Sequence, residues 1–170
     1  MSSTNPLTAA ARVITTTHNA DGKSVFQSDR AVKPVSPFGP DGASLSVFDV
    51  RESVPVSNQE EPKELESSLP RCPPEGVNFG VTNFAPGQSA PMHRTLSLDY
   101  AVILSGEIVL ELDSGEEKTV RAGEFLVQGG TNHMWHNRTD AVCRMAYVMV
   151  GSDKVKLKDG QELDETTIRQ

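Results

Sequence analysis

The stretch 92–117, MHRTLSLDYAVILSGEIVLELDSGEE, decides the fold class of this 170-residue chain. Apolar and polar residues alternate through much of it, and a period of two is typical of a β-strand with one buried face. Ser105-Gly106 and the Asp-Ser-Gly run at 113–115 interrupt this alternation with residues that favour turns. The stretch therefore predicts consecutive short strands joined by tight turns.

The same pattern continues outward from this stretch in both directions. Turn residues at Pro86-Gly87, Ala122-Gly123 and Gly129-Gly130 separate further segments that favour strands. The predicted strands are 12–17, 24–27, 43–50, 77–85, 93–104, 107–112, 116–121, 124–128, 133–137 and 141–150. Many short strands at nearly regular spacing are typical of a sandwich or barrel, so we predict an all-β protein.

The length and the absence of an internal repeat predict a single domain. The long polar and Pro-rich connection 54–76 predicts either a short helix over Glu60–Leu69 or a mobile loop that covers the mouth of a barrel. The polar end of the chain predicts an added strand, a short helix or disorder. The expected organisation is a flexible N-terminus (1–10), a domain (11–151) whose barrel motifs lie within 77–150, and a polar C-terminal tail (152–170).

Charge and composition exclude several classes of partner. Asp and Glu outnumber Lys and Arg by 23 to 16, and no basic cluster offers the contacts that nucleic-acid binding needs. No apolar run approaches the ~18 residues that span a bilayer, and the N-terminus lacks the pattern of a secretory signal. Cys72 and Cys143 lie in unlike contexts, which favours two free thiols in a reducing compartment. We therefore expect a cytoplasmic protein without nucleic-acid or membrane partners.

The residues that carry chemistry share one face of the predicted strand 93–104. Side chains two positions apart point to the same side of a strand, so His93, Thr95, Ser97 and Asp99 lie together. This face is polar at first and becomes apolar at Ala101, as expected for a strand that passes from a pocket into a core.

A second set comes from the predicted strand 133–137. The same parity places His133, Trp135 and Asn137 on one face and turns His136 the other way. Two imidazoles and a carboxylate from two separate strands are therefore expected at one interior point.

These residues resemble the two motifs of the cupin superfamily. The first motif is Gly, five residues, His-x-His, three or four residues, Glu, six residues and Gly. Its positions are matched here by Gly87, His93, Thr95, Asp99 and Gly106. The resemblance implies a cupin fold, a double-stranded β-helix or jelly-roll barrel.

The second cupin motif is matched by Gly123, Gly130, His133 and Asn137, with Gln128 in the proline position and one residue fewer after Gly123. Three longer strings, 12–26, 92–117 and 122–139, resemble small single-domain cupins of the cupin-2 or oxidoreductase-like kind that microbial and fungal biosynthetic gene clusters encode. The resemblance covers roughly residues 11–151.

The cupin pattern holds a divalent metal with three His and one Glu, and this chain departs from it. Thr95 replaces the second His, and Asp99 replaces the Glu. His93, Asp99 and His133 remain as candidate catalytic residues and metal ligands, in the two-His-one-carboxylate set of non-haem iron sites. The sequence leaves two alternatives open. The site holds one Fe, Zn, Mn or Ni ion, or it is metal-free and Asp99 orients a histidine.

Four further residues are candidates for substrate binding. Trp135 could stack on a substrate ring or pack in the core, and Arg94 could hold a carboxylate or make a surface contact. Thr95 and Asn137 lie on the predicted interior face with the histidines.

The leading functional hypothesis is a small-molecule enzyme that acts on an intermediate of specialised metabolism. Metal-assisted or His/Asp acid–base chemistry would carry out a dehydration, decarboxylation, isomerisation or oxidation inside the barrel. The alternative is a non-catalytic cupin that binds a metabolite as a sensor or carrier. Resemblance to small cupins also implies a homodimer whose N-terminal strands pair across the subunit interface.

Overall fold

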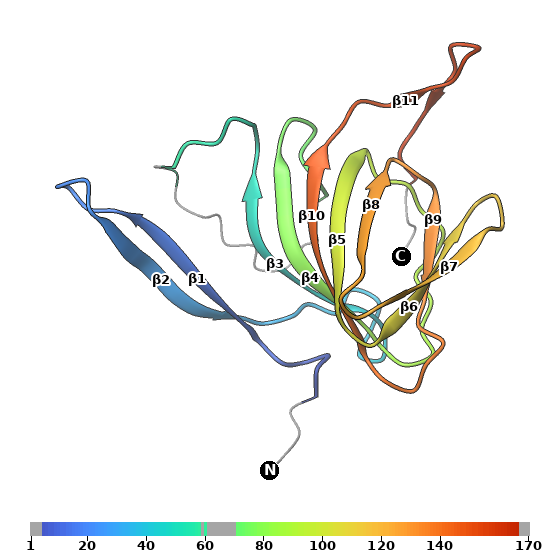
Figure 1. The fold of residues 1–170 in the computed structure, drawn as a ribbon, viewed down its shortest axis with the longest axis horizontal. Coiled ribbons are helices and arrows are strands. Elements are labelled where there is room, and N and C mark those ends of the chain that lie inside the picture. The colour runs from blue at the N-terminus through green and yellow to red at the C-terminus, as the bar shows by residue number, and fades with distance from the viewer. Residues whose placement is uncertain (1–4, 59, 61–70, 167–170) are drawn as a thin grey trace.

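The computed structural model describes residues 5–58, 60 and 71–166, and every regular element within these ranges is a β-strand (Figure 1). The all-β prediction is therefore confirmed. The strands are β1 (Ala11–His18), β2 (Ser24–Val32), β3 (Ser44–Arg51), β4 (Val77–Phe84), β5 (Ser97–Ser105), β6 (Glu107–Leu112), β7 (Glu117–Arg121), β8 (Phe125–Gly129), β9 (His133–His136), β10 (Cys143–Gly151), β11 (Val155–Lys156) and β12 (Glu162–Leu163).

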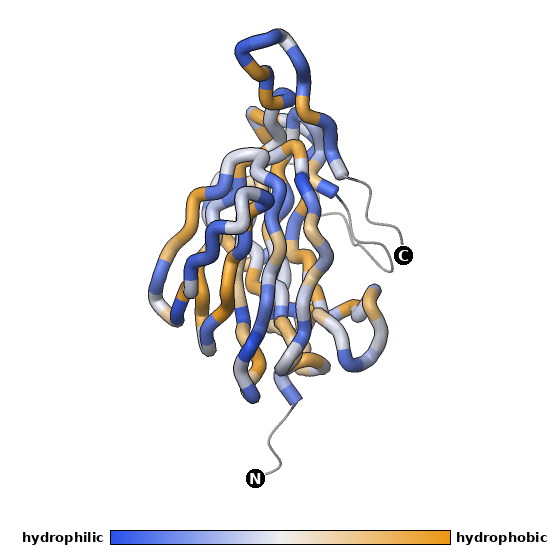
Figure 2. Tube along the Cα trace, turned by 90° about the vertical axis from the view of Figure 1, so that its right-hand side faces the viewer, coloured by the Kyte–Doolittle hydropathy of each residue, from blue (hydrophilic) through white to orange (hydrophobic). Residues whose placement is uncertain are grey.

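Two antiparallel sheets form the body of the molecule. One has the order β3-β4-β10-β5-β8, and the other has the order β7-β6-β9. Hydrophobic and hydrophilic residues alternate along the strands (Figure 2), so each sheet has an apolar face to bury. The main core cluster draws on both sheets and consists of Ala43, Phe84, Ile103, Ile108, Leu110, Trp135, Cys143 and Met145.

The strand that carries the first motif begins later than its sequence predicts. β5 starts at Ser97, and His93 makes only an isolated bridge to His133, through two backbone hydrogen bonds of 2.8 and 2.9 Å. The reason lies in the chain after Gly151, where the amide N–H groups of Ser152 and Thr166 donate to the carbonyls of Leu96 and Arg94. These carbonyls are therefore satisfied outside the main sheet.

The end of the chain resolves one open alternative. Up to Thr166, the polar tail folds as a short hairpin of β11 and β12 that stands out at the top of Figure 1. The helix considered for Glu60–Leu69 lies almost wholly outside the described residues. Both cysteines are free, as expected, and the described part of the chain holds no helix that could cross a membrane.

The N-terminal hairpin lies apart from the two sheets. β1 and β2 pair with each other, and Figure 1 shows them projecting to one side of the barrel. β2 runs on to Val32 and is longer than the predicted strand 24–27. This hairpin exposes Phe26 at 79% and Ile14 at 47%.

Candidate functional site

A cavity of about 330 Å³ lies within the barrel. One group of polar residues in its lining, which we call the polar wall, consists of His93, Thr95, Asp99, Gln128 and His133. Strands β3, β4 and β10 supply an apolar wall, which consists of Leu45, Val47, Phe84, Met145 and Met149. The arrangement suits a small organic molecule that has both an apolar part and polar groups.

The two histidines of the polar wall lie against each other. The ring centroids of His93 and His133 are 4.2 Å apart, and the backbone bridge between the two residues sets this distance. In each ring Nδ1 contacts a carbonyl oxygen two residues earlier, at 2.7 Å from Pro91 O and 3.0 Å from Thr131 O. A carbonyl accepts only, so Nδ1 donates in both rings, and in the neutral form of each ring the lone pair is on Nε2.

Gln128 connects the Asp99 carboxylate to His133. Asp99 and Gln128 face each other across the β5–β8 pair. The Gln128 amide nitrogen lies 3.2 Å from His133 Nε2 and 3.5 Å from Asp99 Oδ2. On the other side the Ser97 hydroxyl donates to Asp99 Oδ1 over 2.6 Å and lies 3.0 Å from the Thr95 hydroxyl.

Burial shifts the pKa values of His133 and Asp99 in opposite directions. Desolvation, with a smaller contribution from the charge of His93, lowers the pKa of His133 to about 4. Desolvation raises the pKa of Asp99 above its ordinary value, against the hydrogen bonds from Ser97 and Gln128 and the charge of His93. His133 is therefore a neutral ring at neutral pH, and Asp99 holds its proton more tightly than an exposed aspartate does.

The expected three-ligand metal centre is not assembled. Among the described residues, one set of three His, Cys, Asp or Glu has its ligand atoms within 4.8 Å of one another, and this set is Glu111, Glu117 and His136. His93, Asp99 and His133 line one cavity but do not meet this distance, and the lone pair of His133 Nε2 already accepts from an amide. The residues of the polar wall therefore do not fit a transition-metal ion as they stand.

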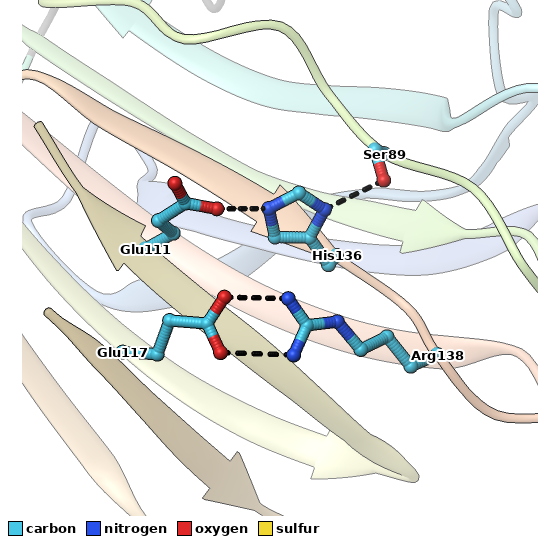
Figure 3. A network of polar contacts seen from close by, with 5 residues as sticks. All are labelled: Ser89, Glu111, Glu117, His136 and Arg138. Atoms are coloured by element: carbon cyan, nitrogen blue, oxygen red, sulfur yellow. Dashed lines mark hydrogen bonds and ion pairs between the residues drawn. The ribbon is translucent and has the colours of Figure 1, made fainter. Parts of the chain in front are cut away.

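The set that does meet the distance is already engaged in polar contacts (Figure 3). His136 bridges the Ser89 hydroxyl at Nδ1 and the Glu111 carboxylate at Nε2, both over 2.7 Å. Arg138 donates two hydrogen bonds to Glu117, and this contact holds the pKa of Glu117 below its usual range. The network ties the segment before His93 to β6, and it explains why His136 faces away from the cavity.

Of the four residues predicted to bind substrate, three line the cavity: Thr95, Trp135 and Arg94. The Trp135 indole, 5% exposed, packs at 6.1 Å from the Phe84 ring and edge-on at 5.7 Å from the His133 ring. Arg94 donates from Nε to Gly130 O and from Nη1 to Asp164 O, so it anchors the tail as well as bordering the cavity.

Asn137, the fourth predicted substrate-binding residue, lies outside the lining of this cavity. Its side-chain amide donates to Phe84 O over 2.9 Å and to Ala141 O over 2.7 Å. Its oxygen accepts from the backbone N–H and the hydroxyl of Thr139. The residue is 1% exposed and holds the turn between β9 and β10.

Replacing Asn137 with alanine is expected to lower the free energy of unfolding by about 2 kcal/mol, because buried carbonyls lose their donors. Urea denaturation followed by tryptophan fluorescence measures this loss. Arg138→Ala is the matched control at the next position, where the lost contact is on the surface and the effect is much smaller. Equal losses in the two variants would show that Asn137 does not support the turn.

Sequence reasoning missed several residues of the cavity. Arg71 and Thr166 come from segments with no periodic pattern, and Asn78, Thr82 and Tyr147 lie on strands whose polar positions carried no motif. Gln128 carried a signal, because it stands in the proline position of the second motif.

Comparisons with known proteins agree with this fold. Residues 80–151 match the model of the Cupin_2 family, described as a cupin domain. The phomopsin biosynthesis cluster protein C′ of Diaporthe leptostromiformis is 35% identical over 159 residues, which cover 89% of this chain and 84% of that protein. The cupin-domain-containing oxidoreductase virC of Hypocrea virens is 32% identical over 151 residues, covering 85% and 77%. The chain therefore belongs to the cupin family.

The solved structures support the same fold. The crystal structure of AerE from Microcystis aeruginosa superposes with a TM-score of 0.50 at 18% identity, over 78% of this chain and 52% of that chain. At this level of identity the likeness shows the fold alone.

Proposed function

We propose that this cupin is an enzyme of specialised metabolism that moves a proton on a small organic molecule held in the cavity. The observation that carries the proposal is the hydrogen bonding of the two ring nitrogens of His93. Its Nδ1 is fixed by Pro91 O, and no described residue hydrogen-bonds to its Nε2. His93 therefore offers the open basic nitrogen of the polar wall to a bound molecule.

Asp99 and His133 have different roles beside this base. Burial raises the pKa of Asp99, so this carboxyl is suited to give a proton back as a general acid. Burial keeps His133 neutral, and its contact with Gln128 occupies the nitrogen that would otherwise act as a second base.

The reaction class follows from the roles proposed for His93 and Asp99. His93 Nε2 would take a proton from a carbon next to a carbonyl group, and Asp99 would return one to carbon or to a departing hydroxyl. Isomerisation and dehydration both need these two transfers. Relatives from fungal biosynthesis clusters support the assignment to specialised metabolism, although several of them carry the name oxidoreductase.

The test uses the wild-type protein and the variant His93→Gln with candidate cluster intermediates, and mass spectrometry follows turnover. We expect the variant to lose at least about 100-fold in kcat while it still binds the ligand, as removal of a general base predicts. Binding is read from the fluorescence of Trp135, the single tryptophan of the chain. His136→Gln is the matched control, since it removes an imidazole outside the cavity and should leave kcat unchanged. Wild-type protein that binds a ligand without converting it would favour the sensor or carrier function instead.

We further propose that the protein is a homodimer. An isolated two-stranded hairpin is marginally stable in water, yet β1 and β2 project from the barrel with Phe26 and Ile14 exposed. The outer face of β5 and β8 exposes Tyr100 at 48% and Val127 at 65%, directly opposite each other in the sheet, and Phe125 at 80%. A second copy of the chain would cover both surfaces, because the apolar residues of its hairpin would pack on the outer face of β5 and β8.

Light scattering after gel filtration is expected to show particles of twice 18.4 kDa. Phe26→Glu places a charge on the hairpin and should shift the population to monomers, whereas Ala20→Glu, at an exposed position in the turn of the same hairpin, should not. Wild-type particles of 18.4 kDa alone would refute the dimer.

A further inference from the structure

Gln128 has a position that its usual surface role does not explain. It lies on β8 opposite Asp99, it is 7% exposed, and it lines the cavity. Its amide nitrogen contacts two ionisable groups of the polar wall, His133 Nε2 at 3.2 Å and Asp99 Oδ2 at 3.5 Å.

The chemistry of these neighbours fixes the orientation of the amide. His133 Nε2 holds a lone pair because Nδ1 donates to Thr131 O, and Asp99 Oδ2 accepts both in the ionised carboxylate and when the proton is on Oδ1. The amide oxygen in this position would face two acceptors, whereas the nitrogen carries two hydrogens and can donate one to each.

The other end of the amide leaves an acceptor without a partner. Gln128 Oε1 is buried, and no described group donates to it. Burying a polar atom without a hydrogen bond is unfavourable, so an apolar side chain of similar size would suit the packing better. The stabilising contribution of Gln128 therefore comes from its nitrogen.

A divalent ion in a cupin cavity would hold the same lone pairs. It would bind His133 Nε2 at about 2.0–2.1 Å and a carboxylate oxygen at a similar distance. One lone pair cannot serve an amide hydrogen and a metal at the same time. Thr95 offers a hydroxyl in place of a third imidazole, so an ion would gain little there in compensation.

We propose that Gln128 is a positioning residue that takes the place of a metal ion, since it joins His133 to Asp99 through its amide nitrogen and blocks binding of a divalent ion at His133. The cavity then keeps its polar geometry without a metal. Removal of the amide frees the lone pairs of His133 and Asp99, so a divalent ion gains access to His133.

The test is a titration with Co²⁺, which quenches the fluorescence of a nearby indole. Trp135 lies at 5.7 Å from the His133 ring and is the single tryptophan, so its emission reports binding at this histidine. All proteins in the titration carry His136→Gln. An ion bound by Glu111, Glu117 and His136 would also quench Trp135, because His136 is the next residue in the chain. Gln128→Ala is expected to bind Co²⁺ at least about tenfold more tightly than the protein with Gln128.

Three further variants make the result decisive. Gln128→Leu keeps the volume of the side chain, removes the amide, and should gain affinity as Gln128→Ala does. Thr82→Val changes a cavity residue on β4, which does not pair with β5 or β8, and should gain none. Adding His133→Ala to Gln128→Ala should abolish the gain.

Equal Co²⁺ affinity with and without the amide would overturn the proposal, and so would a gain that persists without His133. Thermal unfolding of each variant establishes that it is folded before the titration. The readout is metal binding, so the result does not depend on whether the protein is an enzyme.

Discussion

Replacing Gly151 with alanine is expected to lower the free energy of unfolding by more than about 3 kcal/mol. Gly151 ends β10, pairs with Ser97, and donates its N–H to Gly76 O over 2.9 Å. A Cβ atom there would lie 2.2 Å from Pro74 O and 2.4 Å from Pro73 O. Both are backbone atoms, so no side-chain rotation relieves the clash and the segment before β4 has to move.

Gly129→Ala is the matched control for this experiment. Gly129 ends the neighbouring strand β8 and pairs with Leu98, but a Cβ atom there meets only the end of the Leu98 side chain at 3.6 Å. Urea denaturation of both variants at equal concentration gives the two losses. Similar stabilities for Gly151→Ala and Gly129→Ala would mean that the segment 73–76 yields easily.

Stability is expected to fall as the pH is lowered from about 6.5 towards 4, because His133 is buried as a neutral ring. Its pKa is about 4 in the folded protein against 6.5 for an ordinary histidine. Between these values the unfolded chain binds more protons than the folded one, so the free energy of unfolding rises with pH. The contribution of His133 amounts to about 2 kcal/mol between pH 7.5 and 5, and about 3 kcal/mol at most.

Asp99 acts in the opposite direction and has to be separated from this effect. Its raised pKa gives a contribution that is fully present below the ordinary value of 3.8 and is lost as the pH rises through the folded value. Comparing wild type with His133→Asn isolates the histidine, because the variant keeps Asp99 and should lose less stability between pH 7.5 and 5. His18→Asn, which removes an exposed imidazole on β1, serves as the control and should behave as wild type does. An equal loss of stability between pH 7.5 and 5 in wild type and His133→Asn would contradict the assignment.

Local sequence patterns were sufficient to predict most of the fold. The alternation in 92–117 and the glycine-containing turns predict β6 with its observed bounds and its neighbours to within a few residues. The start of β5 was wrong, because alternation cannot show that the carbonyls of Arg94 and Leu96 bond to the distant tail. The tail itself carries no strong pattern, and it folds as a hairpin that contacts the rest of the chain through these bonds.

The candidate site was predictable as a set of residues but not as a geometry. Parity along two strands brings His93, Asp99 and His133 to the lining of one cavity. It does not give the distances between their ligand atoms, which depend on the twist of the strands and on where β5 begins. It also assigns Asn137 to the same face without showing that its amide is engaged by Phe84 O and Ala141 O.

The division of the cavity into a polar and an apolar wall allows substrate choice to change independently of reactivity. Leu45 and Val47 belong to β3, which forms one edge of the large sheet and pairs within it with β4 alone, whereas Asp99 and Gln128 belong to strands at the other end of that sheet. Larger or smaller side chains on β3 would therefore admit molecules of a different shape while the residues of the polar wall keep their positions. Cupins of this kind that serve different biosynthetic routes would then be expected to differ most along that outer strand.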